Sequence, residues 1–243
     1  MSSISQVYAD DNTAAASMTF TEHLEELRAR IFKILLAVCL GMAVSYLYID
    51  EIITIITSPA GKLYYLRPAE AFFIYLKVGV VAGLVLASPL VFYQIWAFIM
   101  PALSVTQRLR LWLVVFSSVS FFLAGLLFAY FLVLPLGLKF FMGFDTFYVQ
   151  PMISMESYID FILMLILPFG VVAEMPLVLT LAACAGLVTS QLLTKVRPYV
   201  IFGIFVLAAI ITPPDVVSQL LLALPMIGLY EAGLLFIRHI LRK

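Results

Sequence analysis

The sequence has few charged residues, and it lacks the short motifs of nucleotide, metal and hydrolytic chemistry. Only 12% of its 243 residues are charged, whereas a soluble domain carries about a quarter. It contains no H-E-x-x-H and no G-x-S-x-G motif. Gly61-Lys62 has neither the earlier glycine nor the following hydroxyl residue of a phosphate loop. We therefore predict that the protein is not an enzyme, needs no cofactor and does not hydrolyse nucleotides itself.

An excess of charge of one sign is also missing. The 14 basic and 14 acidic residues give a formal net charge of zero and form no basic tract, which argues against nucleic acid as a partner. His23 and His239 lie at opposite ends of the chain without other ligands around them, so we predict no metal site. Cys39 and Cys184 lie in separate apolar runs, and we interpret them as small residues of membrane helices.

Apolar residues are what the sequence has in excess. They make up 64% of the chain, and the mean hydropathy is +1.13. A soluble fold of this size could not bury so much apolar surface, so the solvent must be lipid. A bilayer core requires about 20 apolar residues per helix, and we predict an all-α, polytopic membrane protein with six transmembrane helices. The six segments are Ile31–Ile49, about Ala71–Ile95, Leu111–Leu134, about Tyr158–Ala185, Pro198–Ile211 and Val216–Ile237.

Lysines and arginines are distributed unequally between the two sides that six spans create. With a cytoplasmic N-terminus, ten of the 14 lie on the inner side and four on the outer, which predicts that both termini are cytoplasmic. Residues 1–18 resemble neither a cleaved signal peptide nor a transit peptide, and we expect a disordered cytoplasmic tail there. The membrane domain would cover residues 19–240, and residues 241–243 would form a short cytoplasmic C-terminus. The lack of a transit peptide suits a bacterium or an organelle-encoded gene, and we expect the protein in the inner (plasma) membrane of a bacterial cell.

Several residues inside the spans are unusual for membrane helices. We expect Pro135 to stop the third span, and Pro168 and Glu174–Pro176 to interrupt the fourth. Glu174 and Glu231 are acids in apolar helices, where a carboxyl group is usually protonated, paired or directed into a wet cavity. The last two spans are short, and two interpretations stay open: longer neighbours shield them, or this side of the protein thins the bilayer.

A charged amphipathic segment precedes the first span. Thr19-x-x-Glu22 fits a capping box, so we expect a helix to begin here, outside the bilayer. Glu22, Glu26 and Arg30 share one face of this helix. In one interpretation the helix is interfacial, and Glu26 and Arg30 simply pair at i,i+4. In the other, the face is a carboxylate surface that receives a cationic partner, and the spacing alone leaves both open.

Six groups of residues, taken in order, resemble the motifs of TatC, the large core subunit of the twin-arginine protein translocase. They cover nearly the whole chain from Thr19 to Ile240, and the ordered set carries the resemblance rather than any single motif. The groups are Glu22–Arg30; Ser88–Pro89 with Tyr93–Phe98 and Pro101–Leu103; Phe128–Phe131 with Pro135; Phe169–Gly170 with Glu174–Pro176; Arg197–Tyr199; and Thr212–Asp215 with Ser218–Gln219.

The resemblance implies a fold, an activity and partners. The family fold is six helices that form a concave, glove-like wall. The family recognises signal peptides with paired arginines and helps to carry folded precursor proteins outward, powered by the proton-motive force. It acts with small single-span partners, the TatA-like and TatB-like subunits, and we expect self-association as well.

The resemblance also implies a signal-binding site, built from the N-terminal region and the first cytoplasmic loop. Glu26 would bind a guanidinium, with Glu22, Arg28 and Arg30 nearby, and Phe98 would line the site. A carboxylate accepts arginine bidentately, whereas lysine offers only a point charge, and this difference would explain a demand for arginine.

The chain departs from the family pattern at Gln107, where the family usually carries a second glutamate. Glutamine accepts hydrogen bonds but brings no charge, and charge-assisted bonds are roughly twice as strong as neutral ones. Two alternatives follow from this substitution. Either Glu22 or Glu25 supplies the missing charge, or the site binds signals more weakly.

Five further positions would serve assembly by the same resemblance. Pro59, Phe72, Asp215 and Gln219 would be outer-face or hairpin positions, and Glu174 would be a polar spot in the concave wall that meets a partner helix. Two rival hypotheses stay open. A proton-coupled secondary transporter of a small solute would use Glu174 as its proton carrier, although a helix break is expected in only one half. An intramembrane enzyme is the other rival, although the catalytic spacings are missing.

Overall fold

The computed structural model describes residues 20–99, 108–143, 152–211 and 216–238, and nearly all of them are helical. Within these ranges the chain forms no β-strand, only one isolated bridge between Tyr64 and Ser154. The predicted all-α class is confirmed, whereas the two predicted tails lie outside the described residues. The elements are α2 (Phe20–Tyr46), α3 (Ile49–Thr57), η1 (Ser58–Ala60), α4 (Glu70–Ile99), α5 (Arg108–Phe128), the π-helical turn η3 (Ala129–Val133), α6 (Leu134–Met142), α7 (Met155–Val172), α8 (Met175–Cys184), α9 (Ser190–Ile211) and α10 (Val216–Phe236).

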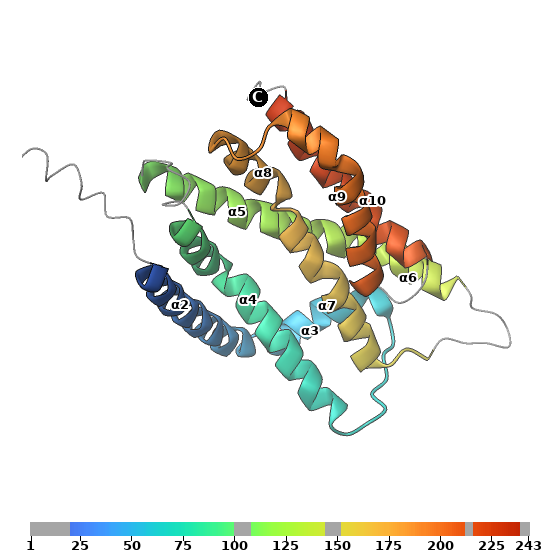
Figure 1. Ribbon diagram of the computed structural model, residues 1–243. Coiled ribbons are helices and arrows are strands. Elements are labelled where there is room, and N and C mark those ends of the chain that lie inside the picture. Colours follow the sequence, from blue (N-terminus) through green and yellow to red (C-terminus); the bar gives the residue numbers. More distant parts are fainter. Residues whose placement is uncertain (1–19, 100–107, 144–151, 212–215, 239–243) are drawn as a thin grey trace, which may run out of the picture.

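The sequence predicts six membrane crossings, and the described helices provide five candidate spans, or six if one bent pair of helices counts as a span. Five helical runs are long and apolar enough to cross a bilayer: α4, Leu111–Met142, Met155–Cys184, α9 and α10. The sixth is α2 with α3 and η1, a pair bent by 83° that qualifies as one broken span. In Figure 1, α2 and α4 lie side by side at one edge of the molecule, α9 and α10 at the other, and α7 lies between them.

The third span does not stop at Pro135, contrary to the prediction. α5 continues through η3 into α6, so one helical run extends from Leu111 to Met142. Proline has no N–H group, and its ring clashes with a carbonyl of the preceding turn in a regular helix. Here a wider π-helical turn directly precedes α6, and Pro135 occupies the first turn of α6, where a missing N–H costs little.

The fourth span breaks once, whereas the sequence suggested two interruptions. α7 runs through Pro168, and the break comes at Ala173 and Glu174, directly before α8. The fifth span is also longer than predicted, because α9 begins at Ser190 and contains Pro198. With 22 residues in α9 and 21 in α10, both helices reach the length of about 20 residues that a crossing requires.

Glycines let α2 and α4 approach until their backbones touch. A Cβ atom on Gly83 would lie 2.5 Å from the Met42 backbone nitrogen, and one on Gly41 would collide with the Gly83 carbonyl oxygen. Tyr46 places its ring against Gly79 in the same crossing. Small residues permit this kind of close packing in membranes, where dispersion contacts replace the hydrophobic effect. The crossing holds the beginning of α2 beside the end of α4.

One buried cluster joins α4, α6, α7 and α10. At its centre, Ile74, Leu134, Ile162, Leu222 and Met226 are all fully buried or nearly so. Many other large apolar side chains are exposed, as expected for helices whose outer surface faces lipid.

The carboxylate of Glu70 fastens the loop between η1 and α4 to the start of α7. It accepts hydrogen bonds from the backbone nitrogens of Leu66 (2.7 Å), Arg67 (3.2 Å) and Glu156 (2.9 Å), and from the Ser154 hydroxyl (2.8 Å). Although Glu70 is buried, both carboxylate oxygens have donors. This side chain therefore has a structural role at the end of the molecule opposite the start of α2.

Candidate functional site

Arg30 joins Glu26 of α2 to the last turns of α4. Its Nε and Nη2 donate to Oε1 of Glu26 over 2.9 and 2.5 Å. Its Nη1 donates to Oε1 of Gln94 over 3.1 Å, and Nη2 donates to the carbonyl oxygen of Ala97 over 3.3 Å. The Glu26 and Arg30 side chains are 25% and 20% exposed. The predicted i,i+4 pair is confirmed, and it belongs to a contact between two helices.

His23 and Phe98 make a second contact between the same helices. Their ring centroids lie 4.3 Å apart, and the ring planes are inclined by only 13°. The Nδ1 atom of His23 lies 4.0 Å from Oε2 of Glu26, the oxygen that Arg30 leaves open. An aromatic face, an imidazole and a carboxylate therefore meet at one place, beside a bound guanidinium.

The structure brings Glu26, Arg30 and Phe98 together, but not every residue predicted for this site. Glu22 and Arg28 are exposed on α2, and Gln107 lies outside the described residues. Sequence reasoning missed Gln94 and His23 as parts of this surface. Gln94 could have been recognised as a candidate because it is an amide residue near the end of an apolar helix. His23 could have been recognised because it lies one helical turn before Glu26.

A second polar position lies at the break between α7 and α8. Glu174 is 8% exposed, and neither of its carboxyl oxygens has a hydrogen-bond partner among the described residues. The Ser118 hydroxyl, which accepts a hydrogen bond from Trp96 Nε1 over 2.7 Å, lies close to it. A groove of about 290 Å³ opens beside Glu174 between α4 and α8, and the rest of its lining is apolar apart from the Trp96 indole. A carboxyl group therefore faces an apolar groove without a partner from the described chain.

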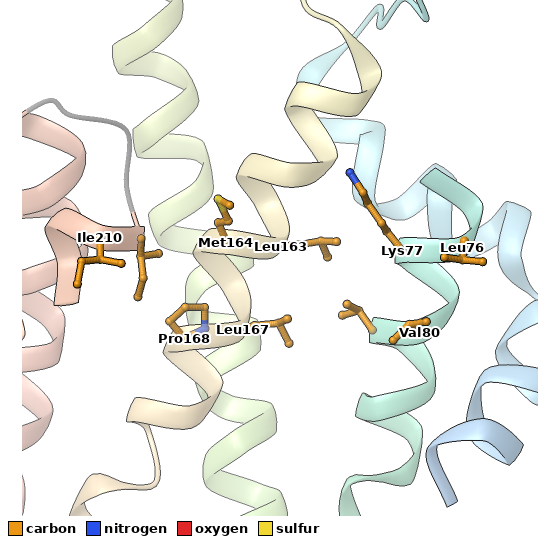
Figure 2. Close-up of a pocket in the computed structure, with 10 residues that line it drawn as sticks. Leu76, Lys77, Val80, Leu163, Met164, Leu167, Pro168 and Ile210 are labelled. Carbon is orange, nitrogen blue, oxygen red and sulfur yellow. The ribbon is translucent and has the colours of Figure 1, made fainter. Parts of the chain in front are cut away.

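A larger groove follows between α4 and α7, towards the opposite end of the molecule. Its volume is about 590 Å³, and Figure 2 shows apolar side chains from both helices around it, with Ile210 of α9 at its side. Lys77 lines this groove and pairs with Asp160 (2.7 Å) and Glu156 (3.5 Å) of α7. The wall formed by α4, α7 and α8 thus has two apolar grooves. Glu174 lies in the lining of the smaller groove, and Lys77 lies in the lining of the larger one.

The residues predicted to serve assembly are scattered over the chain. Pro59 lies half-buried in η1, and Phe72 is 64% exposed at the start of α4. Gln219 donates through Nε2 to the Phe205 carbonyl oxygen over 3.0 Å and thereby joins α10 to α9. Asp215 lies outside the described residues.

The other acid inside a span, Glu231, has a partner. Arg197 of α9 lies 2.5 Å from its Oε1 atom, so an ion pair offsets the cost of placing this carboxylate in an apolar helix. In the part of the chain that the structure describes, no three potential metal ligands come together.

The chain is similar to known proteins along most of its length. The family model of the Sec-independent protein translocase protein (TatC) matches residues 22–225. TatC proteins of Desulforapulum autotrophicum and Escherichia coli are 41% and 36% identical to it, over 89% and 91% of this chain and 83% and 88% of theirs. A crystal structure of the twin-arginine translocase receptor TatC matches with a TM-score of 0.83 and 37% identity, over 89% of this chain and 99% of that one.

These similarities extend over both grooves and over the surface that Glu26 and Phe98 share. They decide against an intramembrane enzyme and do not favour a small-solute transporter. The chain belongs to the TatC family, and it is a component of a Sec-independent protein translocase rather than an enzyme.

Proposed function

We propose that this chain is the subunit that binds twin-arginine signal peptides of folded precursor proteins. The binding surface is formed by the beginning of α2 and the end of α4. One observation carries the proposal: the Glu26 carboxylate holds a guanidinium, that of Arg30, in the contact between two helices. A surface that already positions one guanidinium has the chemistry to bind another.

The open oxygen of Glu26 supports a preference for arginine over lysine. A guanidinium is planar, donates through several N–H groups and stacks on aromatic rings, whereas an ammonium is a compact point charge. Glu26 supplies a carboxylate oxygen and Phe98 supplies a ring face nearby. A planar cation can use both groups at once, and a lysine can use the ring face only weakly.

Gln107 takes part in this site as a neutral acceptor under the proposal. The charge that the family places there is then supplied by Glu22 or Glu25, both exposed on the first turns of α2. An exposed carboxylate contributes less than a half-buried one because water and salt screen it. The second arginine of the signal is accordingly held less tightly than the first.

The wall that carries Glu174 is the surface for a single-span partner of the TatA or TatB type. A carboxyl group in an apolar groove, without a partner among the described residues, gains a hydrogen bond when a partner helix brings a polar side chain to it. Lys77 and its two acids place further polar groups along the same wall. Docking therefore depends on Glu174, whereas signal binding does not.

The remaining parts of the proposal concern topology and energy. Both termini lie in the cytoplasm of a bacterial cell, with the signal surface on the same side, in agreement with the distribution of lysines and arginines. Export of folded proteins is driven by the proton-motive force.

Site-specific crosslinking tests the signal-binding proposal. A photoreactive side chain at position 26 or 107 of the full-length protein should form adducts with a precursor that carries paired arginines. The same precursor with paired lysines is the control and should give few adducts. Equal adducts with both precursors, or adducts only from positions on α9, would place the signal elsewhere. In cells that lack the gene, twin-arginine precursors should stay in the cytosol until the wild-type chain is restored.

A further inference from the structure

His23 occupies a position that has the features of a guanidinium site. Its ring stacks on Phe98 at 4.3 Å and 13°, and its Nδ1 atom faces Oε2 of Glu26 at 4.0 Å. The side chain is still 43% exposed, so packing does not enclose it. A flat ring with a nitrogen at its edge is thus held between an aromatic face and a carboxylate oxygen.

A flat cation would bind to the same two groups, the ring face of Phe98 and the carboxylate of Glu26. A guanidinium binds most strongly when its face lies on an aromatic ring and its N–H groups point at a carboxylate. Oε1 of Glu26 already accepts two hydrogen bonds from Arg30, whereas Oε2 is directed towards His23. A guanidinium that approaches Glu26 therefore has only Oε2 available, and the imidazole of His23 lies beside that oxygen.

We propose that His23 fills the seat of one signal-peptide guanidinium and must leave Phe98 before that guanidinium can bind. The seat consists of the Phe98 ring face and Oε2 of Glu26. Arg30 is a positioning residue in this arrangement, because it fixes Oε1 and so directs Oε2 at the seat. The inference rests on the proposed function, and it adds which atoms receive the arginine and what occupies them in the absence of a signal.

Occupation by His23 has two consequences for binding. The apparent affinity for a signal is reduced by the fraction of molecules in which the seat is open. The seat also selects for shape, because an occupant must be flat enough to replace an imidazole on Phe98. A lysine gains little when His23 leaves, since its ammonium cannot stack as a plane.

Substitutions of His23 test this inference with the full-length protein in detergent. The measurement is equilibrium binding of a fluorescent peptide with paired arginines, and of the same peptide with paired lysines. His23→Ala opens the seat and should tighten binding of the arginine peptide by roughly two- to tenfold, as expected when one aromatic contact no longer competes. The lysine peptide should gain less. His23→Phe keeps a ring on Phe98 and should bind the arginine peptide no more tightly than the wild type.

Leu24→Ala is the matched control, because Leu24 is the next residue on α2 and is exposed. It should leave the affinity for both peptides unchanged, and a thermal melt of each variant reports whether the fold is intact. Weaker binding by His23→Ala and His23→Phe alike would show that the ring only clamps α2 to α4, and the inference would be wrong. Unchanged binding by folded His23→Ala would also refute it. If the wild type does not prefer the arginine peptide, the proposed function itself fails, which is a separate result.

Discussion

Replacing Glu26 with glutamine removes one charge from the proposed signal surface and leaves the side-chain volume almost unchanged. Arg30 keeps its bonds to Gln94 and to the Ala97 carbonyl oxygen, so the contact between α2 and α4 persists. The substitution therefore changes the chemistry offered to a signal peptide more than it changes the packing.

The expected effect on binding follows from the exposure of the pair. Hydrogen bonds to a charged group contribute about 1.5–3 kcal/mol, and neutral ones about 0.5–1.5 kcal/mol. Because Glu26 is 25% exposed and not fully enclosed, we take the difference between the midpoints of these ranges, about 1.3 kcal/mol, or close to tenfold in affinity. The stability of the free protein should fall by only a few tenths of a kcal/mol, as for other partly exposed i,i+4 pairs.

Equilibrium binding of arginine and lysine signal peptides measures this change. Glu26→Gln should lose about tenfold for the arginine peptide and less for the lysine peptide, so the preference for arginine should shrink. Glu25→Gln removes the same charge from the adjacent, exposed position and should lose less, because in the proposal Glu22 or Glu25 serves only the second, less tightly held arginine. If both variants lose equally, or if the loss disappears in moderate salt, a diffuse potential acts rather than a direct contact with Glu26.

Four further substitutions address the rest of the molecule. Gln107→Glu should tighten binding of a twin-arginine peptide about threefold or more at low salt, and an unchanged affinity would remove Gln107 from the site. Glu174→Ala should leave peptide binding near normal and impair partner recruitment and export in cells; equal loss of both activities would contradict that division of roles. Gly83→Ala should lower the stability in detergent by about 1–3 kcal/mol because its methyl group meets the backbone of α2, whereas Gly203→Ala, with open space around it, should not. Glu70→Gln should cost about 1–3 kcal/mol, because an amide group would face N–H donors, and limited proteolysis should then cut the loop before α4 faster; resistance equal to the wild type would refute the structural role of Glu70.

The number and order of the spans were predictable because each depends on a local run of apolar residues. The pair of Glu26 and Arg30 was predictable for the same reason, since it lies within one turn of one helix. The continuation through Pro135 was not, because it depends on a π-helical turn that no propensity of the neighbouring residues indicates. A local rule about proline therefore gave the wrong end for the third span.

The composition of the proposed signal surface could be predicted only in part. Gln94 reaches Arg30 from 64 positions along the chain, and the ring of Phe98 meets His23 from a similar separation. Such contacts depend on how α2 and α4 cross, and the sequence of neither helix alone specifies that register. The helix break beside Glu174 was foreseeable from the nearby proline, but the lack of a hydrogen-bond partner for Glu174 among the described residues depends on how the helices pack around it.

The crossing of α2 and α4 sets the geometry of the proposed arginine-binding surface. Arg30 lies eleven residues from Gly41, and Gln94 lies eleven residues from Gly83, so both stand about 16 Å from the point where the backbones touch. The contact between these glycines therefore fixes the position of the Glu26 carboxylate on α2 relative to the Phe98 ring on α4. Under the proposed function, discrimination between arginine and lysine depends on this preorganised crossing, and a substitution that loosens the crossing should weaken the discrimination without changing any charge.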